Sequence, residues 1–265
     1  MAGNRFHSMF GRSLQALLLG AICLCAAARA HADAYDAAVA HPGRSAADVT
    51  RDSLDHPADL LRLAGIKSGM RVADVLAGDG YYSELASYVV GPKGKVLMIN
   101  NAAFDHWSDG PLQARLASNR LVNVEHQTLD LNHMGLAPAS LDAVLLIKVY
   151  HDLYWVDAKG ADSEGLWPKI DTRGVLDQLA RALKPGGVLL LVDHSAKAGS
   201  GSAAASPLHR IEESYAIKDF ESHGLEVGAR SNLLRRPDDA RDQISYKGAA
   251  LGKTDRFVVV FRKAA

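Results

Sequence analysis

The sequence predicts one α/β domain built on a doubly wound sheet of seven strands, most of them parallel. Two apolar runs, AVLLIKV at 143–149 and VLLLVD at 188–193, have almost no polar alternation. Strands that are buried on both faces have this pattern, and they belong to parallel sheets covered by helices. Helical patterns separate the strand-like runs, and no linker divides the chain after residue 32. Such alternation is typical of doubly wound proteins.

Each element has a local signal. Ser45 and Asp48 are typical of a helix start, and Pro57 marks the start of a second N-terminal helix. Further helical patterns lie at Tyr82–Val89, Thr172–Leu183 and Leu208–His223. The expected strands are Arg71–Val75, Lys95–Ile99, Val122–Gln127, Asp142–Val149, Val188–Val192, Leu225–Ala229 and Arg256–Phe261.

Composition bounds the class of protein. The chain has 265 residues, of which 48% are hydrophobic and 23% charged, with a formal net charge of +0. These values are those of a globular protein and argue against a disordered or fibrous chain. A balanced charge also argues against a dedicated nucleic-acid binder, which is usually basic. Composition leaves the oligomeric state open.

Residues 1–32 have the pattern of a secretory signal peptide. Arg5 and Arg12 precede an apolar run at 14–28, and two small-residue cleavage sites follow, at 28–30 and 30–32. A membrane anchor is the alternative, but the run is shorter than the roughly 20 apolar residues that a spanning helix needs. We therefore expect a periplasmic or secreted protein without a stable membrane anchor.

Cleavage would leave a domain at 33–265. Both cysteines, Cys23 and Cys25, belong to the leader, so the expected mature domain has no disulfide and no thiolate. The leader also carries three arginines and no acidic residue, so the mature chain has 27 basic and 30 acidic residues. Its net charge is −3.

A glycine-containing turn follows the first strand. Residues 72–82 read VADVLAGDGYY. At Gly78 and Gly80 no Cβ keeps a ligand away from the backbone. The N–H groups that open the next helix favour an anionic or polar ligand. By itself this turn is weak evidence, because many α/β proteins need a tight turn there.

The turn resembles the first motif of class I S-adenosylmethionine-dependent methyltransferases, an acid and one residue before Gly-x-Gly-x-Gly. Asp74, Gly78 and Gly80 match, whereas Leu76 stands at the first glycine, so we expect the turn to open differently. LKPGGVLLLVDH at 183–194 is also close to the family. HPADLLRLAGIKSGMRVAD and YHDLYW are similar to a bacterial group described as exported predicted methyltransferases. The resemblance implies a Rossmann-like methyltransferase fold and S-adenosylmethionine as cofactor.

The resemblance also implies a cofactor site. In the family an acid at the end of the second strand binds the ribose; here Asn100 and Asn101 stand there, and an amide binds a diol without charge assistance. Asp130 matches the residue that contacts the adenine amine. The implied cofactor residues are Asp74, Ala77, Gly78, Asp79, Gly80, Asn100, Asn101, Asp130, Leu131, Lys148 and Tyr150.

His151 and Asp152 are the candidate catalytic residues. They follow the fourth strand, where the resembled family faces the methyl group. A histidine with a pKa near neutrality suits proton removal from an acceptor, and Asp152 could orient it. A structural alternative is that Asp152 only caps the next helix. Asp152, Asp193 and His194 could hold a divalent metal, but capping and hydrogen bonding are the favoured interpretation, so no metal is expected.

The sequence therefore predicts methyl transfer to an unidentified small molecule. Two alternatives stay open: a non-catalytic nucleoside-binding protein of the cell envelope, and a metal-assisted hydrolase using Asp152, Asp193 and His194. Residues 153–171 and 195–207 are candidate lids. Tyr154, Trp155 and Trp167 could stack on a ligand or cover the core, and His133, His209 and His223 are interpreted as surface or lid residues.

Overall fold

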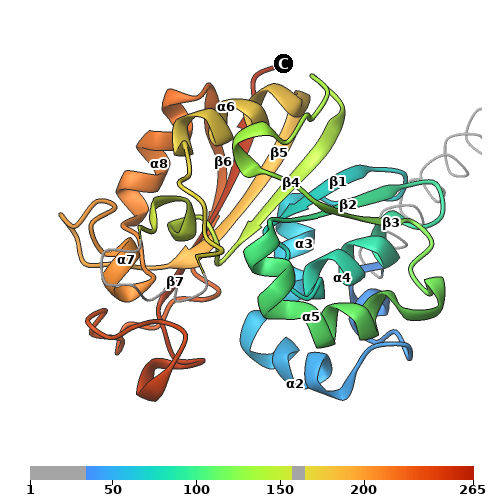
Figure 1. The fold of residues 1–265 in the computed structure, drawn as a ribbon, viewed down its shortest axis with the longest axis horizontal. Helices are drawn as coiled ribbons and strands as arrows, with labels where there is room; N and C mark the ends of the chain where they lie inside the picture. The colour runs from blue at the N-terminus through green and yellow to red at the C-terminus, as the bar shows by residue number, and fades with distance from the viewer. Residues whose placement is uncertain (1–33, 157–164) are drawn as a thin grey trace, which may run out of the picture.

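A computed structural model describes residues 34–156 and 165–265 (Figure 1). The expected leader at 1–32 and part of the first candidate lid lie outside the described residues. Within them, no helix is long and apolar enough to cross a membrane.

The seven expected strands form one sheet with the order β3-β2-β1-β4-β5-β7-β6. All neighbouring pairs from β3 to β5 are parallel, and β7 is antiparallel to both of its neighbours. The predicted fold class is confirmed. The strands are β1 (Arg71–Val75), β2 (Lys95–Asn100), β3 (Val124–Thr128), β4 (Leu141–Ile147), β5 (Leu183–His194), β6 (Leu225–Ser231) and β7 (Arg256–Lys263).

Helices cover both faces of the sheet (Figure 1). Side chains of α3 (Pro57–Ala64) and α4 (Tyr81–Val90) pack on one face, and those of α6 (Thr172–Ala182) and α8 (Glu213–Ser222) pack on the other. The remaining helices are α2 (Ala46–Asp55), which Ser45 caps as expected, α5 (Ala102–Leu116) and α7 (Ala205–Leu208). Short 3-10 turns lie at Ala117–Asn119, Leu131–His133, His151–Tyr154 and Gly248–Ala250.

The helix expected over Leu208–His223 begins too early. The segment contains the last residue of α7, four residues that are not helical, and the whole of α8. Ile211 pairs with Ser195 as an isolated bridge, and the fully buried Arg210 guanidinium forms an ion pair with Asp239 at 2.7 Å. These tertiary contacts override the local helical pattern.

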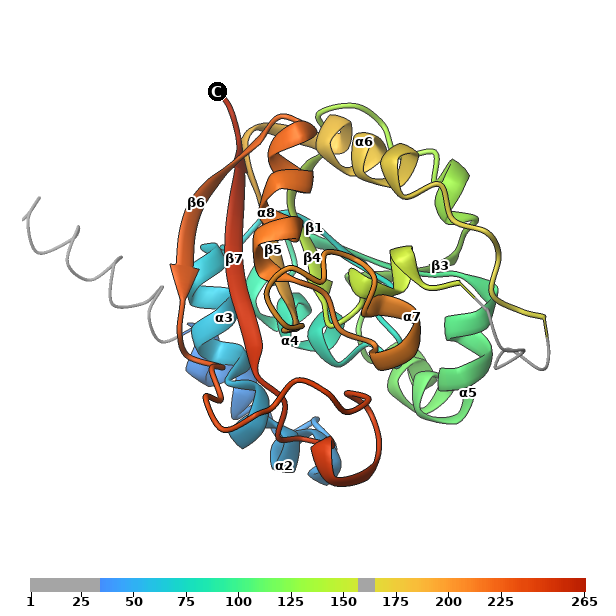
Figure 2. The ribbon, with the colours of Figure 1, turned by 90° about the vertical axis from the view of Figure 1, so that its left-hand side faces the viewer.

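The carboxyl ends of the parallel strands meet at one edge of the sheet. The segment between β6 and β7 lies at this end, and the chain terminates at the opposite end (Figure 2). Arg256, the first residue of β7, bonds to the Asp55 carboxylate and the Leu54 carbonyl at the end of α2. The edge therefore brings together loops that are far apart in the sequence.

Candidate active site

The glycine turn lies between β1 and α4. Gly78 and Gly80 have left-handed backbones, with φ of 60° and 83°. Leu76 also has a positive φ of 54°, with its side chain buried. Leu76 therefore adopts the left-handed conformation that is usual for glycine. The backbone at Leu76 does not show the different opening of the turn that the sequence predicts.

Asn100 holds this turn in place. Its Oδ1 accepts from the Gly78 N–H at 2.9 Å, and its Nδ2 donates to the Gly78 carbonyl at 2.9 Å and to Asp105 at 2.8 Å. A carboxylate could not donate to these two oxygens. These bonds explain why an amide, and not a carboxylate, stands at the end of β2.

Asn101 offers a polar atom without a partner. Its Oδ1 caps α5 by accepting from the Phe104 N–H at 2.9 Å. Its Nδ2 is buried and has no hydrogen-bond partner among the described residues. Buried donors are normally paired, so this amide fits a ligand that brings an acceptor, such as a nucleoside.

The other predicted cofactor residues lie in different environments. Asp74 is buried below the turn, where it accepts from the Ser83 hydroxyl at 2.7 Å, and burial raises its pKa to about 7. Asp130 is exposed and caps the 3-10 turn at Leu131–His133. Leu131 and Tyr150 are core residues, and the Tyr150 hydroxyl donates to Asp219 at 2.5 Å.

Ala77 and Asp79 complete the turn. The Ala77 N–H donates to the Ile99 carbonyl at 3.3 Å. The Asp79 carboxylate lies 3.2 Å from the guanidinium of Arg115, which also contacts Asp48 of α2. The glycine turn is therefore tied to both β2 and α2.

A cavity of about 650 Å³ lies at the carboxyl ends of β4 and β5. Of the residues predicted to bind cofactor or act in catalysis, Lys148, His151 and Asp152 line it. Its aromatic wall consists of Phe104, Trp107, Trp155, Trp167 and Tyr246. Its polar end consists of Lys148, His151, Asp152, His194, His209 and Ser245.

His151 lies between two carboxylates. Its Nδ1 is 2.7 Å from Asp193, which also accepts from the His151 N–H at 2.8 Å, and its Nε2 is 3.2 Å from Asp152. Burial would lower the pKa of His151, but Asp152 and Asp193 outweigh it and raise the pKa to about 10. Without a bound ligand, His151 carries its proton at pH 7, whereas a general base starts neutral. The predicted base role stays a prediction.

Lys148 and His194 line the same cavity as His151. Burial, helped by Arg51, lowers the pKa of Lys148 to about 8, although Asp55 lies 2.9 Å from its Nζ. Burial and nearby positive charges hold the pKa of His194 well below its usual value. Lys148 also has a left-handed backbone, with φ of 63°, where β4 ends at the cavity. Strained residues of this kind cluster at functional sites.

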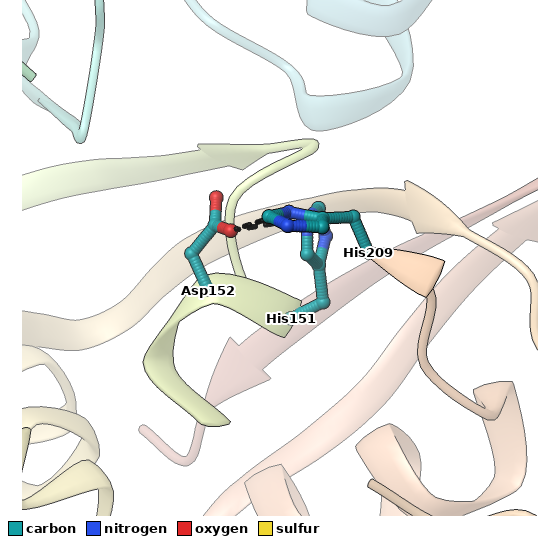
Figure 3. Close-up of side chains that lie close together, drawn as sticks. All are labelled: His151, Asp152 and His209. Atoms are coloured by element: carbon teal, nitrogen blue, oxygen red, sulfur yellow. Dashed lines mark hydrogen bonds and ion pairs between the residues drawn. The ribbon is translucent and has the colours of Figure 1, made fainter. Parts of the chain in front are cut away.

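His209, which the sequence analysis interprets as a surface or lid residue, lies at the polar end of the cavity. Its Nδ1 lies 3.2 Å from the Asp152 carboxylate, on the same oxygen as the His151 ring (Figure 3). Its φ of 49° closes α7 and turns the chain at the cavity. No local motif marks His209, since the contact joins residues 57 positions apart.

The metal set suggested for a hydrolase, Asp152, Asp193 and His194, is not assembled. Asp193 is fully buried and its oxygens accept from His151 and the His194 N–H. The described residues instead bring His151, Asp152 and His209 together. This corrects the grouping named in the hydrolase alternative.

The aromatic residues of the first candidate lid divide between the two expected roles. Trp155 and Trp167 line the cavity, and Trp167 stacks on Trp107 with ring planes 8° apart. Tyr154 packs against the core and donates to Asp219 at 2.5 Å.

Comparisons with known proteins bear on the fold. A scan against protein-family models finds no match, and neither does a search of curated proteins. A SAM-dependent methyltransferase from Aquifex aeolicus is similar in structure, with TM-score 0.56 and 23% identity, covering 80% of this chain and 92% of that one. The YcgJ protein from Bacillus subtilis gives TM-score 0.52 and 16% identity over 80% and 99%.

The [4+2]-cyclase SpnF gives TM-score 0.55 and 13% identity, covering 80% of this chain and 81% of that one. Its name describes a reaction other than methyl transfer, in keeping with the rule that one fold hosts several activities. These likenesses concern architecture. Together with the strand order, they show that this chain has the class I methyltransferase fold.

Proposed function

We propose that the protein transfers a methyl group from S-adenosylmethionine to a small-molecule acceptor held in the 650 Å³ cavity. The observation that carries the proposal is the position of this cavity. It lies at the carboxyl ends of β4 and β5 in a class I methyltransferase fold, where ligands of open α/β sheets bind, and β4 neighbours β1, the strand before the glycine turn.

The glycine turn and its neighbours would hold the methyl donor. Gly78 leaves open space, since a Cβ there would meet only the Ser108 hydroxyl at 3.5 Å. The unpartnered Asn101 amide donates to the nucleoside. When bound, S-adenosylmethionine supplies an electrophilic methyl group on a sulfonium.

The cavity would hold the acceptor. Its indole rings favour an acceptor with a planar apolar body. His151 and Asp152 face the polar group of the acceptor, and Ser245 adds a buried hydroxyl that has no partner among the described residues. Most of the rate enhancement then comes from orientation of the acceptor toward the methyl group.

Calorimetric titration with S-adenosylmethionine tests the first half of this proposal. We expect binding by the natural chain and its loss in Gly78→Arg. Gly69→Arg is the matched control, because Gly69 also has a positive φ and open surroundings but precedes β1 at its other end. No binding at millimolar ligand, or equal loss in both variants, contradicts the proposal.

Turnover separates an enzyme from a binding protein. We expect methyl transfer from labelled S-adenosylmethionine to some members of a panel of small aromatic alcohols and amines. The alternative of a non-catalytic nucleoside-binding protein is favoured by the raised pKa of His151, because its two carboxylate partners leave it without a free base at pH 7. Tight binding without transfer to any acceptor would support that alternative.

We also propose that residues 1–32 direct export to the periplasm or beyond. The proposal rests on the basic start, the apolar run and the small-residue cleavage sites. Cell fractionation of the natural chain and of a chain lacking residues 2–32 tests it. Retention of both forms in the cytosol would contradict it.

A further inference from the structure

Three potential metal ligands meet at the polar end of the cavity. His151 and Asp152 come from the 3-10 turn after β4, and His209 comes from the end of α7 (Figure 3). Each offers one ligand atom, and the three atoms lie within 4.8 Å of one another. Because all three residues line the cavity, a bound ion would be reachable by a ligand.

The distances suit a transition metal. The Asp152 oxygen lies 3.2 Å from His151 Nε2 and 3.2 Å from His209 Nδ1. Two ligand atoms that are each about 2.1 Å from a tetrahedral ion lie about 3.4 Å apart. Small rotations of the two rings would therefore close the site around an ion.

Asp193 gives His151 the support that metal-binding histidines normally have. Its carboxylate accepts from His151 Nδ1 at 2.7 Å and from the His151 backbone N–H at 2.8 Å. This arrangement fixes the ring and leaves Nε2 as the ligand atom, which would bind the ion after releasing its proton to solvent. Asp193 is fully buried, so its position is set by the fold.

Two residues of the aromatic wall pack beside the candidate ligands. Tyr246 meets the His209 ring edge-on at 4.7 Å between centroids, and Trp155 lies at 6.2 Å. Both rings line the cavity together with His151, Asp152 and His209. Asp152 and Asp193 together provide two carboxylates, which balance the charge of a divalent ion.

We propose that His151, Asp152 and His209 bind one divalent transition-metal ion, with Asp193 as the support of His151 and the remaining coordination positions open to the cavity. Two imidazoles and one carboxylate favour ions such as Zn²⁺, Co²⁺ or Fe²⁺ over Mg²⁺ and Ca²⁺, which prefer oxygen ligands. The ion would take an oxygen of the bound small molecule. This inference does not depend on methyl transfer.

Co²⁺ titration of the tag-free, chelator-treated protein tests the site. We expect visible absorption bands that saturate at one Co²⁺ per chain, and their loss when Zn²⁺ is added. His209→Ala and Asp152→Asn should each weaken Co²⁺ binding by about 10-fold or more. Asp193→Asn removes no ligand and should weaken it by about 10- to 100-fold. Circular dichroism and thermal unfolding of each variant show that it is folded.

His133→Ala is the matched control. His133 also pairs with an aspartate, Asp130, at 3.0 Å, but this pair is exposed and lies outside the cavity. We expect its Co²⁺ titration to match that of the natural chain. The proposal is overturned by the absence of stoichiometric Co²⁺ and Zn²⁺ binding, by unchanged binding in folded His209→Ala, or by equal loss in His133→Ala.

Discussion

The carboxyl edge of the sheet has two halves, one at the ends of β1 and β2 and one at the ends of β4 and β5. Their polar side chains have different kinds of partner. At the ends of β1 and β2, Asn100 bonds to Gly78, and Arg115 joins the turn to α2. At the ends of β4 and β5, His151, Asp152 and His209 face a cavity. The first half presents a shaped backbone, whereas the second presents reactive side chains. Under the proposed function, the first half would bind the nucleoside and the second half would hold the molecule on which the chemistry takes place.

The largest effect is expected from Arg115→Met in the first half. Arg115 is the shared partner of Asp48 at 2.9 Å and of Glu84, both buried. Removing one member of a buried ion network costs about 3–5 kcal/mol. Urea denaturation measures this loss in the free energy of unfolding. The control is Lys95→Met, which breaks an exposed ion pair with Glu125 and should cost less than about 1 kcal/mol. Equal stability of the two variants would contradict the assigned role of Arg115.

The corresponding anchor of the second half is Arg210. Its buried guanidinium binds Asp239 and the carbonyls of Ser195 and Gln243, next to the segment that lines the cavity. Arg210→Met should lower the free energy of unfolding by about 3 kcal/mol. S-adenosylmethionine affinity should change in Arg115→Met but not in Arg210→Met.

The control for Arg210 is Arg241→Met. Arg241 contacts Asp255 at 2.9 Å from the same segment, but its side chain is partly exposed. A loss below about 1 kcal/mol is expected in the same urea titration. If Arg241→Met destabilised the protein as much as Arg210→Met, burial would not explain the difference.

An intermediate effect is expected from Asp74 and depends on pH. Burial raises the pKa of Asp74 to about 7, above its value in the unfolded chain. The folded state therefore binds this proton more tightly, and stability falls as pH rises from 5 to 8. In Asp74→Asn this fall should be smaller by about 2 kcal/mol, at about 1.4 kcal/mol per pH unit. Identical slopes of unfolding free energy against pH would show that Asp74 does not titrate in this range.

The smallest effect on stability is expected at Asn101. Asn101→Ala removes the cap of α5 and should cost about 1 kcal/mol. It should also weaken S-adenosylmethionine binding, because the unpartnered amide is lost. Asp171→Ala removes the equivalent cap of α6 at a similar cost and should leave the affinity unchanged. Equal affinities in calorimetry would remove Asn101 from the proposed nucleoside site.

Local pattern predicts the sheet well and the cavity poorly. The apolar runs identify β4 and β5, because strands that are buried on both faces consist largely of apolar residues. The other five strands also lie where the sequence predicts them. The helix expected over Leu208–His223 is confirmed only from Glu213 onward, because periodicity does not reveal the ion pair of Arg210 with Asp239. For the same reason, His209 is joined to Asp152 only in the folded chain.

The glycine turn is predicted less fully than the sheet and more fully than the cavity. Its sequence identifies the place, but not the bonds that Asn100 forms with Gly78, nor the left-handed backbone of Leu76. Both depend on how β2 lies beside β1. A motif thus gives the position of a site, and the tertiary structure gives its chemistry.

A crystal structure of the protein with S-adenosylhomocysteine tests the central claim most directly, namely that the two halves of the edge hold different molecules. We predict electron density for the nucleoside against Gly78 and Asn101, with the sulfur directed toward His151 and an empty aromatic cavity beyond it. A ligand that occupies the cavity and leaves the glycine turn empty would contradict the account.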